Sequence, residues 1–360
     1  MLVVPGFRAE RCVRYRYSYS ECSRCADACP HEAIRLFDAG IEVLSEHCRH
    51  CGLCAGACQT EALSQKGVSA DHLLKMAGDS VWMTIACAPS ALEGTAVVPC
   101  LGAVHPVVLA ELSRHDITVD LAGAEHCAEC AHASKGPDMI RANLAAHEIL
   151  SAEAPAPFAA AALRAEGAEA SGIHEKLDVA RRSLFHRIVG HGVDVVSGKF
   201  EAAPAPLKAI RAAAPFLPER KAILNNLYTT AGEDAIAIAR HDALPAEDWQ
   251  VTRGCTYCEA CVRVCPTGAL QLLESNTAWR LAFLNDRCVA CDVCAEVCQP
   301  KVLRQASAEK VIINKQKGRL LAAVAKRRCA RCDRVFVSES GSEICPICSG
   351  DDDDFASIFG

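Results

Sequence analysis

The sequence predicts an α+β protein of several domains, in which two cysteine-rich units flank a small α/β domain and a cysteine-bearing tail follows. The chain has 360 residues, of which 24 are cysteine. The cysteines fall into four blocks, with eight in 12–58, four in 87–130, eight in 255–298 and four in 329–348. Four is the ligand number of structural zinc and of many iron–sulfur clusters, so this division leaves no thiol without a metal site.

Length and composition exclude several classes of protein. A chain of 360 residues can bury an ordinary core without disulfide staples. The first residues show no basic segment followed by an apolar one, and no window approaches 18 consecutive apolar residues. We therefore expect no secretory signal, no membrane span and a cytoplasmic location, where thiols bind metals instead of forming disulfides. The net charge of −6 argues against a nucleic-acid partner.

The strongest motif lies in the third block, in residues 251–306. Two runs follow one another: Cys255-x2-Cys258-x2-Cys261-x3-Cys265-Pro266 and Cys288-x2-Cys291-x2-Cys294-x3-Cys298. Zinc sites use two CxxC-type pairs per metal, so this spacing favours iron–sulfur clusters. The runs, with the ending Cys265-Pro266-Thr267-Gly268-Ala269-Leu270, resemble the bacterial dicluster ferredoxin family, which holds two cubane [4Fe–4S] clusters.

This resemblance implies a fold of small β-hairpins and short helices around the two cubanes. It also implies crossed ligation, in which the fourth cysteine of each run binds the neighbouring cluster. Site C is then the set Cys255, Cys258, Cys261 and Cys298. Site D is the set Cys265, Cys288, Cys291 and Cys294.

The first block, in residues 1–75, repeats this plan with an interruption. Its second run is regular, but its first reads Cys12-x9-Cys22-x2-Cys25-x3-Cys29-Pro30, with seven extra residues after Cys12 in a stretch rich in tyrosine. The same resemblance implies site A (Cys12, Cys22, Cys25, Cys58) and site B (Cys29, Cys48, Cys51, Cys54). A free Cys12 beside a cluster with three protein ligands stays open. We expect His31, His47 and His50 to lie near the clusters without binding them.

Residues 79–150 predict a small α/β domain. Apolar, β-branched runs at 81–86, 96–98 and 117–122 alternate with helical segments at 106–114 and from Pro137 to Leu150. A strand precedes each cysteine position, and the carboxyl ends of parallel strands meet at one edge of a sheet. We therefore expect Cys87, Cys100, Cys127 and Cys130 to form one metal site, called the middle site.

Two segments of this domain resemble the iron–sulfur domain of the delta subunit of methyl-viologen-reducing hydrogenase. They are Cys100-Leu101-Gly102-Ala103-Val104-His105-Pro106 and 123–132. The resemblance implies a [2Fe–2S] cluster and a link between a redox enzyme and its partner. Cys127 and Cys130 lie closer together than the corresponding pair of that family, so [2Fe–2S], [4Fe–4S] and zinc all stay open. We expect His126 and His132 to be neighbours of the site and not ligands.

Residues 151–250 contain no cysteine and predict a linker, 151–172, followed by a helical connector. Helices are expected at 175–188, 207–213 and 219–227. In the tail, 325–350, two knuckles predict a tetrahedral zinc ribbon formed by Cys329, Cys332, Cys345 and Cys348. The Cys345-Pro346-Ile347-Cys348 knuckle also resembles that of rubredoxins, so an iron site is the alternative, although Asp333 replaces the glycine of that family.

Together these sites predict a polyferredoxin that carries single electrons between a soluble donor and a larger oxidoreductase, of formate dehydrogenase or hydrogenase type by analogy only. The expected cofactors are four [4Fe–4S] clusters, one [2Fe–2S] or [4Fe–4S] cluster and one zinc or rubredoxin-type iron. No catalytic residue is expected, because the sequence shows no P-loop, GxGxxG segment or free thiol. The alternatives are a disulfide or small-molecule reductase that uses the middle site, and a structural or assembly protein with non-redox metals.

Overall fold

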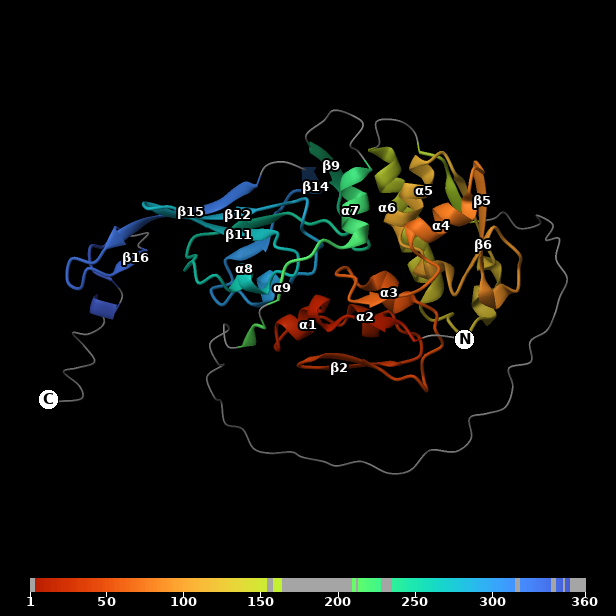
Figure 1. The fold of residues 1–360 in the computed structure, drawn as a ribbon, viewed down its shortest axis with the longest axis horizontal. Helices are drawn as coiled ribbons and strands as arrows, with labels where there is room; N and C mark the ends of the chain where they lie inside the picture. The colour runs from red at the N-terminus through yellow and green to blue at the C-terminus, as the bar shows by residue number, and fades with distance from the viewer. Residues whose placement is uncertain are drawn as a thin grey trace, which may run out of the picture.

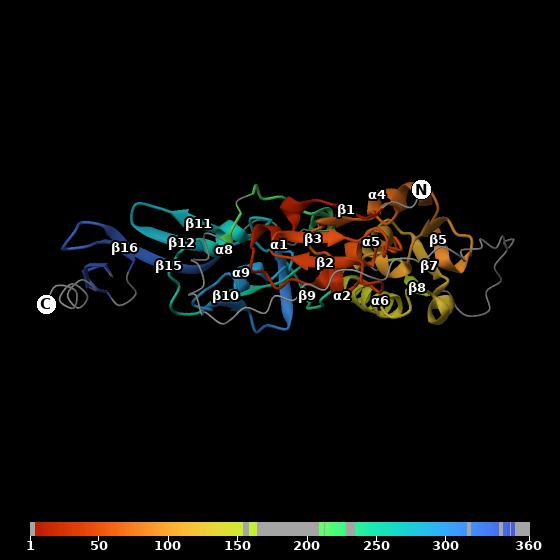
Figure 2. The ribbon, with the colours of Figure 1, turned by 90° about the horizontal axis from the view of Figure 1, so that it is seen from below.

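The computed structural model describes residues 4–153, 158–163, 209–211, 213–227, 235–314, 318–337, 341–345 and 347–349. It is a mixed α/β protein of several parts (Figure 1). An α/β body lies at one end, two ferredoxin-like regions lie beside it, and an arm with the C-terminal knuckle lies at the other end. Seen from below, the molecule is elongated, with the α/β body and the arm at opposite ends (Figure 2).

The N-terminal unit is built from two small antiparallel pairs and very short helices. Strand β1 (Gly6–Phe7) pairs with β4 (Leu63–Ser64), and β2 (Ile34–Phe37) pairs with β3 (Gly40–Val43). The short helices are η1 (Ala9–Arg11), α1 (Val13–Arg16), α2 (Arg24–Asp27) and α3 (Leu53–Ala57). Such short elements cannot build a sizeable apolar core, and cysteines make up much of the buried cluster that they share.

The middle domain has the parallel sheet that the alternating apolar runs predict. Its strand order is β6-β5-β7-β8, formed by β5 (Trp82–Cys87), β6 (Ala96–Val98), β7 (Thr118–Ala122) and β8 (Ala161–Leu163). The helices are α4 (Ala70–Ala77), α5 (Pro106–Arg114) and α6 (Gly136–Ala152), with the 3-10 turns η2 (Ala88–Ser90), η3 (Leu101–Ala103) and η4 (Ala124–Glu129). Met83, Ile85 and Leu112 are fully buried in the core between sheet and helices.

The segment expected as linker and helical connector contributes strands as well as a helix. Strand β8 completes the middle sheet, although its residues lie in the predicted linker. Helix α7 (Glu219–Asn226) is found where the sequence predicts it, and β9 (Ala235–Ala239) pairs with β14 (Lys310–Asn314). These elements share a buried cluster with α5 and α6. Segments that precede and follow the third cysteine block, 255–298, therefore both pack onto the middle domain.

The helix expected at 207–213 is wrong for its described residues. Ile210 forms an isolated antiparallel bridge with Tyr17, and the N–H groups of Ser18 and Arg211 donate to Ala209 and Arg16. The backbone groups of this segment are therefore satisfied by the insertion after Cys12 instead of by a helix of their own. The helix expected at 175–188 lies outside the described residues.

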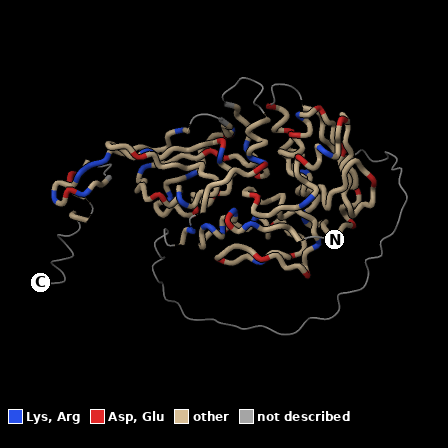
Figure 3. Tube along the Cα trace, in the orientation of Figure 1, with Lys and Arg blue, Asp and Glu red and all other residues tan. Residues whose placement is uncertain are grey.

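The C-terminal unit repeats the plan of the first and then extends it. Strand β10 (Trp249–Val251) pairs with β13 (Leu303–Gln305), while helices α8 (Ala260–Val264) and α9 (Val293–Glu296) carry cysteines. The second sheet has the order β11-β12-β15-β16, formed by β11 (Leu270–Glu274), β12 (Ala278–Phe283), β15 (Arg319–Arg328) and β16 (Val335–Val337). Lys and Arg are frequent on the arm formed by β15 and β16 (Figure 3).

The two ferredoxin-like units pack directly on one another. Val13 and Tyr17 of the insertion lie in one buried cluster with Val264 of α8 and Val293 of α9. An ion pair of 3.4 Å joins the Arg24 guanidinium to the Asp292 carboxylate across the same contact. Units that flank the middle domain in sequence are therefore neighbours in space. Within the described part of the chain, no helix has both the length and the apolar character needed to cross a membrane.

Candidate metal centres

The cysteine runs share one backbone trace. A residue with positive φ stands two positions after the first cysteine of three runs: His50 (φ 59°), Tyr257 (φ 52°) and Ala290 (φ 53°). Another stands three positions after the last cysteine of all four runs: Glu32, Glu61, Gly268 and Lys301. Three of those four are not glycine, and left-handed backbone costs such residues about 1–2 kcal/mol each. Because left-handed residues recur at the same offsets, the cysteine loops share one backbone conformation.

This conformation directs backbone N–H groups toward cysteine sulfurs. The N–H of Ala33 lies 3.3 Å from the Cys29 sulfur, and the N–H of Ala269 lies 3.2 Å from the Cys265 sulfur. Each donor follows its cysteine by four residues, directly after the left-handed position. Backbone N–H groups that point at thiolates stabilise their negative charge, which is what a ligand to a cluster needs.

In the C-terminal unit the structure brings together the cysteines that the sequence assigns to each site. Burial, followed by the thiolates of Cys255, Cys258 and Cys298, raises the pKa of Cys261 to about 12. Burial likewise raises the pKa of Cys294, and thiolates of site D lie around it. Thiols crowded in this way in a dry site are unfavourable as free thiolates, but they fit a cationic iron core that binds four thiolates.

The N-terminal unit shows the same two groups. Burial raises the pKa of Cys25, and the thiolates of Cys58, Cys22 and Cys12 add to the shift. Burial, followed by the other thiolates of site B, raises the pKa of Cys54 to about 12. Cys12 is itself buried among these groups, in one cluster with Cys25 and Cys54. Despite the insertion, the chain therefore returns Cys12 to the other three thiols of site A.

The middle site lies at the carboxyl edge of the parallel sheet, as the strand pattern predicts. Cys87 ends β5, Cys100 follows β6, and Cys127 and Cys130 follow β7. All four line one cavity of about 210 Å³. Burial raises the pKa of Cys100 to about 12, with the thiolates of Cys51, Cys87 and Cys127 near it. Cys51 belongs to site B, so the middle site and site B are neighbours.

Two histidines that the sequence places beside different sites meet between them. The His31 Nε2 and His132 Nδ1 atoms are 2.8 Å apart, and a ring nitrogen of each lies within 4.8 Å of the Cys51 sulfur. Burial lowers the pKa of both rings, which favours their neutral form. The sequence analysis expected both as neighbours of clusters, but it did not foresee that they join site B to the middle site.

The sulfur atoms of the C-terminal knuckle lie closer together than those of the other sites. The sulfur atoms of Cys329, Cys332, Cys345 and Cys348 all lie within 4.8 Å of one another, and those of Cys332 and Cys345 are 3.8 Å apart. A tetrahedral ion with bonds of about 2.3 Å to sulfur separates its ligands by about 3.8 Å. Among the described thiols, no other set brings three sulfurs this close. The knuckle therefore fits a single ion, and the other sets fit wider clusters.

The thiol sets form a row. Cys100 of the middle site is buried with Cys51 of site B, and Cys54 of site B is buried with Cys25 of site A. In the contact between the units, Cys291 of site D lines one cavity with all four thiols of site A, whereas Cys261 of site C shares only the wider apolar cluster with Cys22. Cys294 of site D and Cys261 of site C pack in another. The order through space is middle site, B, A, D, C.

Comparison with known proteins agrees with this geometry. Residues 20–64 and 254–302 match the family described as the 4Fe-4S dicluster domain. The chain contains two 4Fe–4S dicluster domains. They make it an iron–sulfur, ferredoxin-like protein, and such clusters imply electron transfer. The first match begins at Ser20, so Cys12 and most of the insertion lie outside it.

The polyferredoxin protein MvhB of Methanothermobacter marburgensis is 38% identical to this chain over 60 residues. The aligned segment covers 13% of this chain and 15% of that relative. The similarity is polyferredoxin-like, and it is confined to a small part of each protein.

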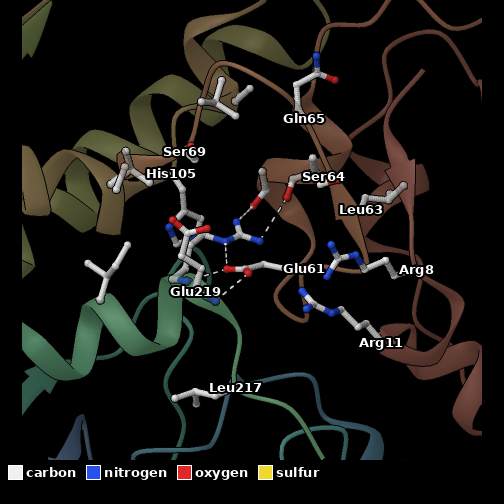
Figure 4. A pocket seen from close by; sticks show the side chains of 18 residues that line it. Arg8, Arg11, Glu61, Leu63, Ser64, Gln65, Ser69, His105, Leu217 and Glu219 are labelled. Carbon is white, nitrogen blue, oxygen red and sulfur yellow. Dashed lines mark hydrogen bonds and ion pairs between the residues drawn. The ribbon is translucent and has the colours of Figure 1, made fainter. Parts of the chain in front are cut away.

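Helix α7 is tied to the N-terminal unit by a buried ion pair inside a cavity of about 370 Å³ (Figure 4). The Nε atom of Arg220 is 3.0 Å from the Glu61 carboxylate, which also accepts from the backbone N–H groups of Glu219 and Arg220. Figure 4 shows Glu61 near the centre, with Arg8 and Arg11 on one side and Glu219 on the other. Glu61, three residues after the last cysteine of site A, thus caps the N-terminus of α7.

Gly123 gives a test of the middle site. Its φ is +100°, and a Cβ there would lie 2.6 Å from the Ser90 side chain and 2.9 Å from the Cys87 sulfur. We expect Gly123→Ala to destabilise the middle domain by about 2–5 kcal/mol, because overpacking and left-handed strain add. The iron content after anaerobic loading should fall only by the number of iron atoms that the middle site binds.

The matched control is Gly67→Ala. Gly67 also has positive φ, +86°, but no heavy atom lies within 4 Å of its Cβ position. This variant carries only the backbone strain, about 1–2 kcal/mol, and should keep all its iron. Equal iron in the two variants would show that the crowding at Gly123 is not what shapes the middle site.

Proposed function

We propose that this protein relays single electrons along the row formed by the middle site and sites B, A, D and C. The observation that carries the proposal is the row itself, in which at least one cysteine of each set shares a buried cluster or a cavity with a cysteine of the next set. When bound, the clusters would supply one-electron carriers, and the chain supplies the thiolates, the N–H donors and the spacing. Sites A to D would each hold a [4Fe–4S] cluster, and the middle site a [2Fe–2S] or a [4Fe–4S] cluster.

The two ends of the row differ in structure and are both open to partners. At one end Cys258 of site C is exposed. At the other the thiols line the 210 Å³ cavity together with His126 and Glu129. A relay needs a separate entry and exit. We therefore assign the two ends to a soluble electron carrier and to a larger oxidoreductase, of hydrogenase or formate dehydrogenase type by analogy only.

The knuckle holds zinc in this proposal and takes no part in the relay. Its sulfur spacing fits one ion, and it lies on the arm away from the row (Figure 1). The Cys329 sulfur accepts from the backbone N–H of Cys345 at 3.3 Å, and such donors lower the pKa of the Cys329 thiol. A thiolate held in this way suits a structural ion that cross-links the end of the arm.

Metal content tests the assignment directly. Anaerobically purified protein should contain about 18 iron atoms and one zinc if the middle site is [2Fe–2S], and about 20 if it is [4Fe–4S]. Dithionite should reduce several centres, each followed by electron paramagnetic resonance. Clusters that resist dithionite would contradict the relay, and a second zinc in place of iron would reassign the middle site.

A reductase that uses the middle site would behave differently. Turnover of a disulfide by the isolated chain, lost in Cys127→Ser, would favour that alternative over the relay. The relay predicts no such turnover. It predicts instead that Cys127→Ser alters only the signal of the middle site.

A further inference from the structure

Two cations are completely buried in the contact around site D. Arg16 and Lys221 both have 0% exposed surface, and neither belongs to the C-terminal unit that supplies the thiols. Arg16 lies on α1, in the insertion that interrupts the first cysteine run, and Lys221 lies on α7. A buried charge is unfavourable unless an opposite charge lies nearby, so the counter-charge of each must be identified.

The partners of Arg16 are neutral carbonyls. Its guanidinium donates to the carbonyl oxygens of Glu10 at 2.7 Å, Ala213 at 3.2 Å and Ala214 at 2.8 Å. The segment that it holds then contacts site D, because the Phe216 N–H donates to the Pro266 carbonyl, next to Cys265. Burial lowers the pKa of Arg16, and the anions that oppose this shift most are the thiolates of Cys265 and Cys291, followed by Glu10.

Lys221 approaches site D from the other side. Its ammonium donates to the Pro245 carbonyl at 3.1 Å. One turn further along α7, the Asn225 amide donates to the Asp286 carbonyl, two residues before Cys288. Burial lowers the pKa of Lys221 to about 8, and the opposing anions are the Cys288 thiolate and then Asp286.

No carboxylate of the described chain lies within ion-pair distance of either cation. The buried carboxylates of this region, Glu247 and Asp248, are already paired with Arg240 and Arg319. Four thiolates around an iron core of roughly +2 leave a net charge of about −2. Two buried positive charges therefore face a site whose negative charge matches them.

We propose that Arg16 and Lys221 are the counter-charges of site D and raise its reduction potential, so that the site at the junction of the two units holds an electron more readily than it would without them. The inference rests on the relay proposed above. A fixed positive charge favours the more negative, reduced form of a neighbouring centre, and in a dry site little solvent screens the effect. One electron arrives from a neighbouring site, which is oxidised as site D is reduced, and no proton is required.

The insertion after Cys12 gains a function from this inference. It brings Val13 and Tyr17 to the contact with the second unit, and it places Arg16 against site D. The apolar contact with the second unit and the positive charge near site D both come from α1 and the residue that follows it. The contribution of Arg16 to site D therefore depends on the two units being packed together.

The test is a reductive titration of the full, anaerobically loaded chain, followed by electron paramagnetic resonance. The midpoint of site D is identified as the one lost in Cys291→Ser. Lys221→Met should lower that midpoint by at least about 59 mV, a tenfold weaker reduction equilibrium, and leave the other midpoints in place. Arg263→Gln, which removes an exposed cation of α8, is the matched control and should leave site D unchanged.

Arg16 supplies a second comparison that does not depend on Lys221. Arg16→Gln should lower the midpoint of site D, whereas Arg16→Lys, which keeps the charge, should restore most of it. Unchanged midpoints in fully loaded Lys221→Met would overturn the inference. If that variant does not load, equal midpoints in Arg16→Gln and Arg16→Lys would overturn it. In either case, wild-type clusters that dithionite reduces would leave the relay itself standing.

Discussion

Replacement of Arg220 by methionine should lower the free energy of unfolding by about 3–5 kcal/mol and release iron from site A. The Arg220 side chain is buried against Glu61, and its guanidinium donates to the carbonyls of Ala55, Gly56 and Cys58 at the end of α3. Removing one member of a buried ion pair leaves the other charge uncompensated. Here it also leaves three carbonyls without their donor, one of which belongs to a predicted ligand of site A.

The measurement is the denaturant midpoint for loss of cluster absorbance, together with iron content. Arg35→Met is the matched control, because Arg35 forms a 2.9 Å ion pair with Glu42 on the hairpin of the same unit, but both side chains are more than half exposed. Exposed pairs contribute about 0–1 kcal/mol, so the control should change the denaturant midpoint and the iron content very little. Similar midpoints for the two variants would mean that α7 is not what secures the loop of site A.

Replacement of Cys298 by serine should remove or damage the cluster of site C and leave site D intact. Cys298 directly follows the three cysteines of the second run, yet it is a charged neighbour of Cys261 in the first. Because three thiolates hold a cubane poorly, we expect a loss of up to about four iron atoms per chain. Sites A and B should keep their signals.

Two further variants make the comparison decisive. Cys258→Ser removes a cysteine that belongs to site C whether or not the ligation is crossed, and Cys291→Ser removes one that belongs to site D in either case. The spectrum of Cys298→Ser should match that of Cys258→Ser and differ from that of Cys291→Ser. The opposite match would refute the crossed assignment, and with it the pairing of Cys265 with Cys288.

Much of the candidate site could be predicted from the sequence because cysteine spacing is a local property. A run such as Cys288-x2-Cys291-x2-Cys294 already contains the turns that point three sulfurs inward, and the left-handed residues recur at the same offsets in different runs. The strands before Cys87 and Cys100 were equally predictable, because a buried parallel strand is a short apolar run.

The errors fall where the chain is held by distant partners. Residues 209–211 form no helix, because Ser18 and Arg16 satisfy their backbone groups across nearly 200 residues of sequence. Strand β8 lies in a segment of small residues with no strand-like alternation, and it is ordered by pairing with β7. Local propensity carries no information about such partners.

The sequence by itself determined that this protein contains two dicluster units and a C-terminal four-cysteine knuckle, because the number and spacing of cysteines are local properties of the chain. Only the tertiary structure decided the order of the sites. That order depends on α1 docking between the units and on α7 linking three parts, and both contacts join residues far apart in sequence. The charge around site D was decided in the same way, since Arg16 and Lys221 become its neighbours only when the units pack.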